Sequence, residues 1–455
     1  MNILINFHKF LTKSSSLRTK IFFSSLWLLC FIPLNINPEE FQKLPIITKA
    51  RLIFPLLIVF FSCIFLIKNL NTKKNFFIIL PFFYFFLCSL FVFSSLNYNS
   101  HLNLYWGLAM FIPYFYIFLF LEKIENLKSF LFFSLFALLT IFVIFTANGF
   151  ILLWLQVPNV VDLYSVTGAY TNYENDITGP FPRSSGLARM GLLLYIAILV
   201  FLFFSKNKFT LKYRKIFSVS LIILGTITLI FQSRTINFIY LLINILLTVI
   251  IFRKNSFKIK KFLLITILPI IFAISTLHYM KYSLHSNKSS NKSSNNDESL
   301  ILNNSIKLLF RDNPNKDTSY YSYSSNRFEN WEKIFKITSK NIYRGYGFQS
   351  DKKIINQSAH NVYMYALICG GIISLFLVIL ISLRCIWTSM SVLYNYYFQN
   401  KKIDELDLIS ILFMFVFLLR SVLETSYGVY SIDFLFFIIC FLIIESNYKL
   451  KKIIK

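Results

Sequence analysis

The sequence predicts an all-α polytopic membrane protein with about twelve transmembrane helices, and three observations lead to this prediction. The chain of 455 residues is 56% hydrophobic and has only 15% charged residues, whereas soluble domains have about a quarter. Its apolar residues lie in blocks of roughly 17–22, the length of helix that crosses a hydrocarbon layer about 30 Å thick. Its basic residues gather between these blocks.

Twelve apolar blocks are long enough to cross a membrane, at residues 21–37, 50–67, 75–96, 104–121, 129–147, 186–204, 215–232, 235–252, 262–279, 361–383, 406–424 and 430–446. A further apolar piece, 150–157, is too short to cross, and both a re-entrant and an interfacial position stay open for it. The pattern divides the chain into 1–279 with helices 1–9 and a longer loop at 148–185, a large loop at 280–360, and 361–455 with three helices and a basic tail.

The placement of the basic residues decides what the net charge of +26 means. In a soluble protein such a charge favours nucleic acid. Here the Lys and Arg residues lie at both termini and in alternate loops, while the loops at 97–103 and 425–429 have none. The positive-inside rule then predicts two cytoplasmic termini and no nucleic-acid partner. No cleavage pattern of small residues follows the first block, so we expect an uncleaved first span.

The large loop has two parts of different character. Residues 286–299 form a low-complexity polar tract. Residues 327–338 predict an amphipathic helix, which begins at Arg327 and is expected to lie along the membrane surface or to cap the helical bundle with one apolar face. That face is expected to contain Phe328, Trp331, Phe335 and Thr338, with Ile334 beside them. The pair Gly370–Gly371, inside the tenth block, indicates close helix packing.

Four arginines are candidates for binding an anion at the outer mouth of the bundle. Arg234 lies in the short link between two blocks, and its planar guanidinium suits phosphate oxygens; snorkelling to lipid headgroups is the alternative. Arg189 lies inside an apolar run, where a cation needs an anionic partner. For Arg183 the alternative is a solvated loop charge, and for Arg327 it is a solvated charge at the start of a helix.

A histidine is the candidate base. His360 directly precedes the tenth block, and an unperturbed pKa near 6.5 suits a general base at neutral pH; an interfacial polar residue is the alternative. Asn361 could orient it or bind a sugar hydroxyl. Arg420 and Glu424 are spaced i, i+4 and are expected to form an ion pair or to line a donor site. No Cys/His cluster has metal spacing and the acidic residues suggest no metal cage, so we expect no metal or cofactor.

The order of these motifs along the chain resembles that of a known family. They are Arg189, Ser233-Arg234, Asn326-Arg327-Phe328-x-x-Trp331, Gly-Tyr-Gly-Phe at 345–348, His360-Asn361-x-Tyr363, Gly-Gly-Ile-Ile at 370–373 and Arg420-x-x-x-Glu424. The set resembles the O-antigen ligase and O-antigen polymerase superfamily of bacterial inner membranes. The resemblance covers about 180–430, and the tract at 286–299 is longer and more polar than the family pattern needs.

The resemblance implies a GT-C-like helical bundle with a large periplasmic loop before the third-last helix. It implies metal-independent, inverting transfer of a glycan from undecaprenyl pyrophosphate to an acceptor hydroxyl at the periplasmic face. Arg189, Arg234 and Arg327 would bind the donor pyrophosphate, and His360 would deprotonate the acceptor. Arg183, Asn361, Arg420 and Glu424 would support the site.

Three acceptors stay open for such an enzyme: lipid A–core, another lipid-linked glycan, or a protein side chain. A flippase or polysaccharide transporter is the alternative from another class, because twelve spans also fit a transporter. Transporters commonly show internal repeats and broken helices near the membrane midplane. The sequence shows no convincing repeat, and its polar candidates cluster at one mouth.

Overall fold

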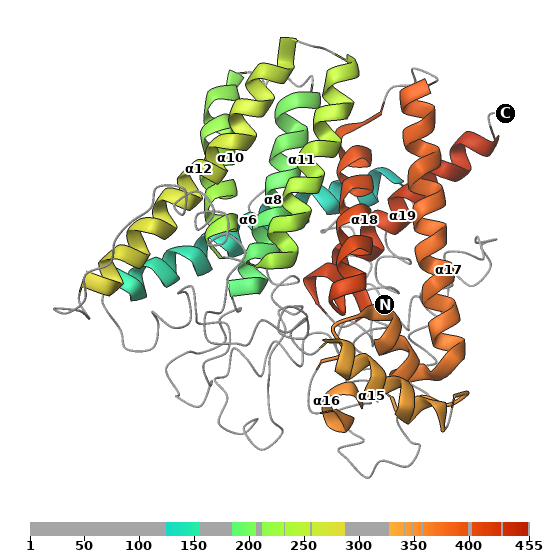
Figure 1. Cartoon of the computed structure of the whole chain (residues 1–455). Helices are drawn as coiled ribbons and strands as arrows, with labels where there is room; N and C mark the ends of the chain where they lie inside the picture. The colour runs from blue at the N-terminus through green and yellow to red at the C-terminus, as the bar shows by residue number, and fades with distance from the viewer. Residues whose placement is uncertain are drawn as a thin grey trace, which may run out of the picture. The chain divides into compact units, whose positions relative to one another are not determined.

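The computed structural model describes residues 124–154, 184–205, 212–231, 233–254, 257–286, 327–340, 342–347, 350–355, 358–398, 403–428 and 431–453 (Figure 1). Regular structure in these residues is helical throughout, which confirms the predicted all-α class for this part of the chain. The first four predicted spans, Arg183 and the tract after Ser286 lie outside the described residues.

The described helices are α6 (Ile124–Trp154), α8 (Ser184–Phe204), α10 (Arg214–Ile230), α11 (Arg234–Lys254), α12 (Phe257–Ser286), α15 (Arg327–Ser339), α16 (Ser350–Ile354), α17 (Val362–Phe398), α18 (Glu405–Leu423), the 3₁₀ turn η4 (Ser426–Gly428) and α19 (Ile432–Ile453). Six of them are long and apolar enough to cross a membrane: α6, α8, α11, α12, α17 and α18. The chain is therefore a membrane protein, and the number twelve stays a prediction.

Two helices continue into segments that were predicted as loops, because a helix does not end where its apolar run ends. α6 continues to Trp154, so the beginning of the predicted loop at 148–185 is helical. α12 continues to Ser286, past the predicted end at 279. In both cases the residues after the apolar run contain no proline, and helix propensity lets the backbone continue.

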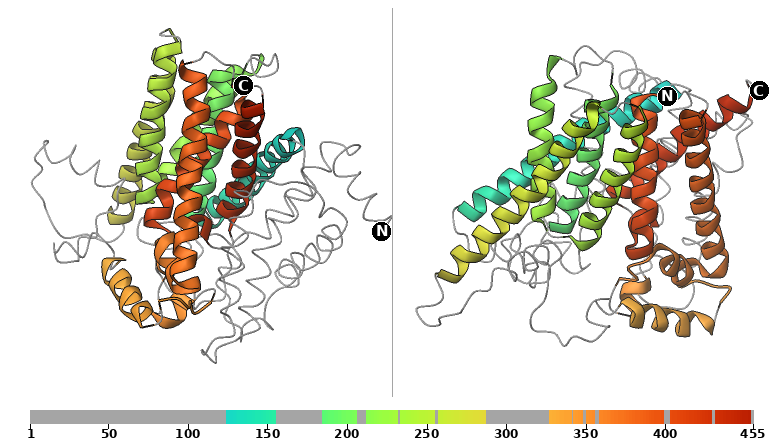
Figure 2. Two further views of the ribbon diagram at one scale, coloured as in Figure 1. Left: turned by 90° about the vertical axis from the view of Figure 1, so that its right-hand side faces the viewer. Right: turned by 45° about the horizontal axis from the view of Figure 1, so that its top comes forward.

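The chain forms two compact units, and one of them is Leu138–Lys316. In this unit α10 packs against α8 and α12, and α11 packs against the same two helices (Figures 1 and 2). Close approach depends on glycine at Gly225, where a Cβ atom would lie 2.9 Å from Pro269 of α12. Between α8 and α11, the Tyr195 hydroxyl donates a hydrogen bond of 3.0 Å to Asn244.

The other unit comprises Met1–Ala137 and Asp317–Lys455. Its core is the packing of α18 against α19 and of α17 against both. Phenylalanines line the α18–α19 contact, where the rings of Phe413 and Phe436 meet edge to face with 5.8 Å between their centroids. The helices α15 and α16 pack against α17 (Figure 1).

α17 is a helical hairpin and not the straight span predicted at 361–383. Gly371 has φ 71° and ψ −167°, so helical geometry stops there and resumes after it. The Tyr363 hydroxyl then donates a hydrogen bond of 3.1 Å to Ser382, although 19 residues of continuous helix would separate them by about 28 Å. The short half, Val362–Gly370, therefore folds back along the long half. The prediction treated Gly371 as a packing glycine, whereas its positive φ makes it the bend.

The segment Ile342–Gly347 fills the gap that the bend opens in the helix. Tyr346 N–H donates to the Ile368 carbonyl at 2.8 Å, and Gly347 N–H donates to the Cys369 carbonyl at 2.9 Å. In the other direction, Ile372 N–H donates to the Ile342 carbonyl at 2.9 Å. Backbone groups that the broken helix leaves without helical partners are thus bonded, as buried backbone requires.

We expect Gly345→Ala to destabilise this connection strongly. A Cβ atom on Gly345 would lie 1.9 Å from the Cys369 carbonyl oxygen, so the segment must move and its three hydrogen bonds to α17 must lengthen. The expected loss is about 3 kcal/mol of unfolding free energy. Thermal unfolding of the purified protein in detergent measures it, with the exposed neighbour Arg344→Ala as the control. Equal melting temperatures for the two variants would contradict the close contact.

Candidate functional site

His360 lies at the turn that leads into α17, and its backbone conformation is unusual. Its φ is +49°, in the left-handed region, which few residues other than glycine adopt but which histidine, asparagine and aspartate tolerate comparatively well. The residue is half-buried. Such a conformation costs free energy and persists where the surrounding structure enforces it.

The residue before His360 is held from two sides. The Trp331 indole Nε1–H of α15 donates a hydrogen bond of 2.7 Å to the Ala359 carbonyl. The Ala359 N–H donates one of 2.9 Å to the Asp351 carboxylate of α16. Ala359 itself is fully buried. Both polar groups of one peptide residue are therefore fixed by neighbouring helices, directly before the strained histidine.

The residue after His360 is fixed as well. Asn361 Oδ1 accepts hydrogen bonds from the N–H groups of Tyr363 and Met364 at 2.8 and 3.0 Å, which caps α17. Its Nδ2 donates to the Val422 carbonyl at 2.9 Å, near the end of α18. These bonds assign Asn361 to supporting the backbone around His360. Both the Oδ1 and the Nδ2 of Asn361 take part in these bonds, although the sequence analysis also considered this amide for binding a sugar hydroxyl.

The length of α18 and its contact with Asn361 indicate the depth of His360 relative to a membrane. Its 19 residues are about 28 Å long, close to the thickness of a hydrocarbon core. Because Asn361 bonds to Val422, His360 lies level with the C-terminal end of α18. The histidine is therefore at the level of one membrane boundary if α18 crosses the membrane upright.

Arg327 is the first residue of α15, one helical turn before Trp331. It is half-buried, and its Nε is fully buried with no hydrogen-bond partner among the described residues. Residues four apart share a helix face, so Arg327 lies on the face whose Trp331 reaches Ala359. Arg327 is therefore on the same face of α15 as the tryptophan that bonds to the residue before His360.

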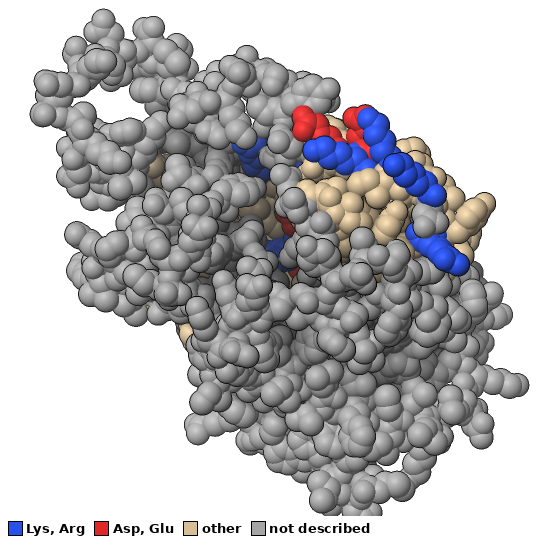
Figure 3. All heavy atoms as spheres, turned by 90° about the horizontal axis from the view of Figure 1, so that it is seen from below, with Lys and Arg blue, Asp and Glu red and all other residues tan. Residues whose placement is uncertain are grey.

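The buried face of α15 differs from the predicted one. Asn330, Ile334 and Thr338 are buried, whereas Phe328 and Phe335 are 47% and 60% exposed. Of the residues predicted on the apolar face, Ile334 and Thr338 are fully buried, because the bond from Trp331 and the packing on α17 fix the rotation of the helix. The charged side of α15 carries the exposed pair Glu332–Lys336, 2.6 Å apart. Figure 3 shows basic and acidic side chains side by side on this end of the molecule.

Arg420 is committed to partners inside the bundle. It is 1% exposed and forms ion pairs with Glu424, as its i, i+4 spacing predicts, and with Asp433 at the start of α19. The ion-pair interpretation is confirmed, and Asp433 is a partner that the sequence analysis missed. An acidic residue at the start of an apolar block was the available signal.

Arg189 and Arg234 lie in the unit Leu138–Lys316, and both are half-buried. Arg234 begins α11, and Arg189 is in the second turn of α8. The Tyr195–Asn244 hydrogen bond sets α8 and α11 in register, so both arginines lie at the N-terminal ends of two neighbouring helices. Within their unit they occupy the same end of the bundle.

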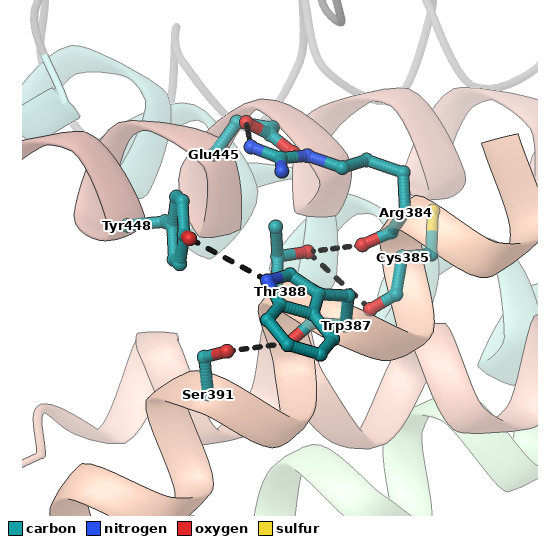
Figure 4. Close-up of polar contacts among 7 residues, drawn as sticks. All are labelled: Arg384, Cys385, Trp387, Thr388, Ser391, Glu445 and Tyr448. Atoms are coloured by element: carbon teal, nitrogen blue, oxygen red, sulfur yellow. Dashed lines mark hydrogen bonds and ion pairs between the residues drawn. The ribbon is translucent and has the colours of Figure 1, made fainter. Parts of the chain in front are cut away.

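A second buried ion pair was not predicted at all. Arg384 of α17 binds Glu445 of α19 through two bonds, from Nε at 2.6 Å and from Nη2 at 2.9 Å (Figure 4). Its guanidinium also lies 4.9 Å from the centre of the Tyr448 ring. Arg384 directly follows the predicted tenth block. A basic residue at that position is commonly interpreted as a charge at the membrane boundary, and this is why its ion pair was not predicted. The pair connects α17 to α19.

A cavity of about 330 Å³ lies at the other end of α18 from His360, lined by Glu125, Lys128, Ser129, Phe132, Phe133, Asp404 and Leu406. There Lys128 of α6 lies 2.9 Å from Asp404 and 2.8 Å from Asp407. Partial burial raises the pKa of Asp404, but hydrogen bonds from the Glu405 N–H and Lys128 outweigh it and hold this pKa below its usual value. The length of α18 separates this cavity from the candidate site.

Among the described residues, no three His, Cys, Asp or Glu side chains lie together so that they could hold a metal ion. Comparison of the chain with protein-family models, curated proteins and solved structures finds no match.

Proposed function

We propose that this membrane protein transfers a glycan from an undecaprenyl-pyrophosphate carrier to an acceptor hydroxyl. His360 acts as the general base, and Arg327 binds the pyrophosphate. The observation that carries the proposal is the contact between α15, which begins at Arg327, and the residue before His360. A strained, firmly held histidine directly before α17 lies beside a helix whose first residue is an arginine with a buried, unpaired Nε.

The chemistry needs few groups. The acceptor oxygen attacks the anomeric carbon on the face opposite the pyrophosphate. The bond from that carbon to the pyrophosphate oxygen breaks, and its electron pair stays on the leaving group. A ring nitrogen of His360 takes the hydroxyl proton. Guanidinium groups stabilise the negative charge that develops on the pyrophosphate, and Arg327 has the free donor for this task.

The level of His360 suits a substrate of this kind. A polyprenyl chain stays in the bilayer, while its pyrophosphate and glycan lie at the surface. His360, which lies level with the C-terminal end of α18, can act on a glycan and a pyrophosphate that lie at this surface. In this proposal the site faces the periplasm, both termini are cytoplasmic, and twelve helices form a GT-C-like bundle in the bacterial inner membrane. Arg189 and Arg234, which share one end of their unit, are the further candidates for the donor phosphates.

The broken helix α17 does not favour the transporter alternative. Discontinuous helices of transporters offer backbone groups to a bound substrate or ion. Here backbone groups beside the bend are bonded to the segment Ile342–Gly347. The bend therefore serves to connect α17 with the segment Ile342–Gly347.

Deletion of the gene, followed by analysis of the glycolipids and glycoproteins, tests the proposal. Loss of long glycan from lipid A–core with accumulation of lipid-linked polymer identifies a ligase, and a single repeat unit on the core identifies a polymerase. Unchanged glycolipids with altered glycoproteins identify a protein transferase. Lipid-linked glycan that accumulates on the cytoplasmic side identifies a flippase. If all glycolipids and glycoproteins are unchanged, glycan transfer is excluded.

We expect Arg327→Ala to lower glycan transfer by about a hundredfold, because one preorganised donor to the leaving group is lost. Arg327→Lys should recover only part of the rate, since a point charge does not reproduce the guanidinium fork. Release of undecaprenyl pyrophosphate by the purified protein measures both. Arg344→Ala, which removes an exposed arginine of the same unit, is the matched control. A similar rate for Arg327→Ala and the control would remove Arg327 from the donor site.

A further inference from the structure

Two cations lie together at one end of the unit Leu138–Lys316. Arg214 is the first residue of α10, and Lys261 is in the second turn of α12. They are close enough for the positive charge of Arg214 to act unfavourably on that of Lys261. Like charges repel, so their proximity costs free energy until an anion binds beside both.

The packing of the two helices brings these cations together. α10 and α12 lie side by side (Figure 1), and Gly225 of α10 meets Pro269 of α12. Arg214 precedes Gly225 by eleven residues, which is about three helical turns, so it lies on the α10 face that meets α12. Arg214 and Lys261 are a second pair between the same helices, nearer to their beginnings. Because the two pairs follow in the same order along both helices, the helices are parallel and both N-terminal ends lie at this end of the unit.

The sequence around these helices supplies no acidic side chain to compensate the cations. The chain has no Asp or Glu between Asp176 and Asp297. The Nε of Arg214 is buried and has no hydrogen-bond partner among the described residues. The two N-terminal ends add backbone N–H groups and the positive ends of two helix dipoles. This end of the unit therefore offers both hydrogen-bond donors and positive charge to an anion.

Apolar side chains begin directly beyond the cations. Exposed residues at the spacing i, i+3, i+7 form one stripe on each helix: Ile216, Val219 and Ile223 on α10, and Leu264, Ile267 and Ile271 on α12. Such spacing places the side chains on one face of a helix. A phospholipid has the matching order, because its phosphate is followed by its acyl chains.

We propose that the beginnings of α10 and α12 form a binding site for an anionic phospholipid. Its phosphate lies beside Arg214 and Lys261, and its acyl chains follow the two apolar stripes. Basic pockets between transmembrane helices bind such headgroups on the cytoplasmic side, which is the side to which the positive-inside rule assigns the basic loops. Arg234 follows the other end of α10, so this lipid site is separate from the candidate donor-phosphate residues and does not depend on the proposed function.

Thermal unfolding of the full-length purified protein in a neutral detergent tests the site. Phosphatidylglycerol is the anionic probe, and phosphatidylcholine with the same acyl chains is the probe without net charge. Phosphatidylglycerol should raise the melting temperature in a saturable way, with an apparent affinity about tenfold higher than that of phosphatidylcholine. Inorganic phosphate, which has the charge without the chains, should leave the melting temperature unchanged over the same concentrations.

The decisive variant is Arg214→Gln/Lys261→Gln, because it removes both charges and glutamine is well tolerated in helices. Its apparent affinity for phosphatidylglycerol should fall by about thirtyfold. The matched control is Lys333→Gln/Lys340→Gln, which removes two exposed positive charges from the other unit and should respond like the wild-type protein. If the double variant does not fold, Lys261→Gln replaces it, since this side chain is exposed, and about a fivefold fall is expected.

Four results would overturn the proposal. An equal affinity of the charge-deficient variant and the control for phosphatidylglycerol would show that the lipid does not depend on these cations. Equal affinities for the two phospholipids would indicate binding through acyl chains only, and an equal response to inorganic phosphate would indicate a site for a free anion. A wild-type protein whose melting temperature does not respond to phosphatidylglycerol has no such site.

Discussion

His360→Asn should reduce glycan transfer by a factor of about 10² to 10⁴, the usual contribution of a general base. Asparagine is the sharper replacement because it tolerates a positive φ, and His360 has φ +49°. The backbone between Ala359 and Asn361 should then keep its hydrogen bonds, while the side chain can no longer accept a proton. The rate of undecaprenyl pyrophosphate release measures the loss.

The control is His278→Asn, which changes a histidine of α12 that has no place in the proposed chemistry. Both variants should reach the membrane in wild-type amounts and melt at similar temperatures. Turnover of His360→Asn at the wild-type rate would exclude His360 as the base and leave the chain without a candidate for that role.

Arg420→Leu should destabilise the protein by about 3–5 kcal/mol, because it leaves a buried carboxylate without its counterion. That carboxylate is Asp433, which is 1% exposed, as is Arg420 itself. The measurement is thermal unfolding in detergent. The double variant Arg420→Leu/Asp433→Leu should recover most of the loss, since replacement of a whole buried ion pair by apolar residues is often nearly neutral.

The control for this experiment is an exposed pair of the same unit. Lys336→Ala breaks the ion pair with Glu332 on the water-facing side of α15, and it should leave the melting temperature unchanged because solvent screens exposed charges. A double variant as unstable as Arg420→Leu alone would show that Arg420 acts through something other than Asp433.

The fold class and several elements could be predicted from the sequence because they depend on local patterns. Apolar blocks predicted the six described helices that are long enough to cross, and the loop pattern predicted α15 to within one residue at its C-terminal end. The i, i+4 spacing predicted the contact between Arg420 and Glu424.

The other features depend on contacts between segments that are distant in sequence. The hairpin in α17 could not be predicted, because Gly371 lies in an apolar run that also suits a straight helix. Its bend is stabilised by bonds from the segment around Tyr346. The contact of Asp351 with Ala359 could not be predicted either, because it joins two segments through a backbone N–H. Asp433 and Glu445 gave a signal as acidic residues in apolar surroundings, but not the identity of their partners.

The bend in α17 has a consequence for the order in which the protein is made. The ribosome synthesises the segment Ile342–Gly347 before the Ile368 and Cys369 carbonyls, which accept its hydrogen bonds. The anchor for Asn361, the Val422 carbonyl, comes about sixty residues later still. A nascent chain released before α18 is complete therefore lacks the geometry around His360. This part of the molecule therefore matures only after α18 has been synthesised.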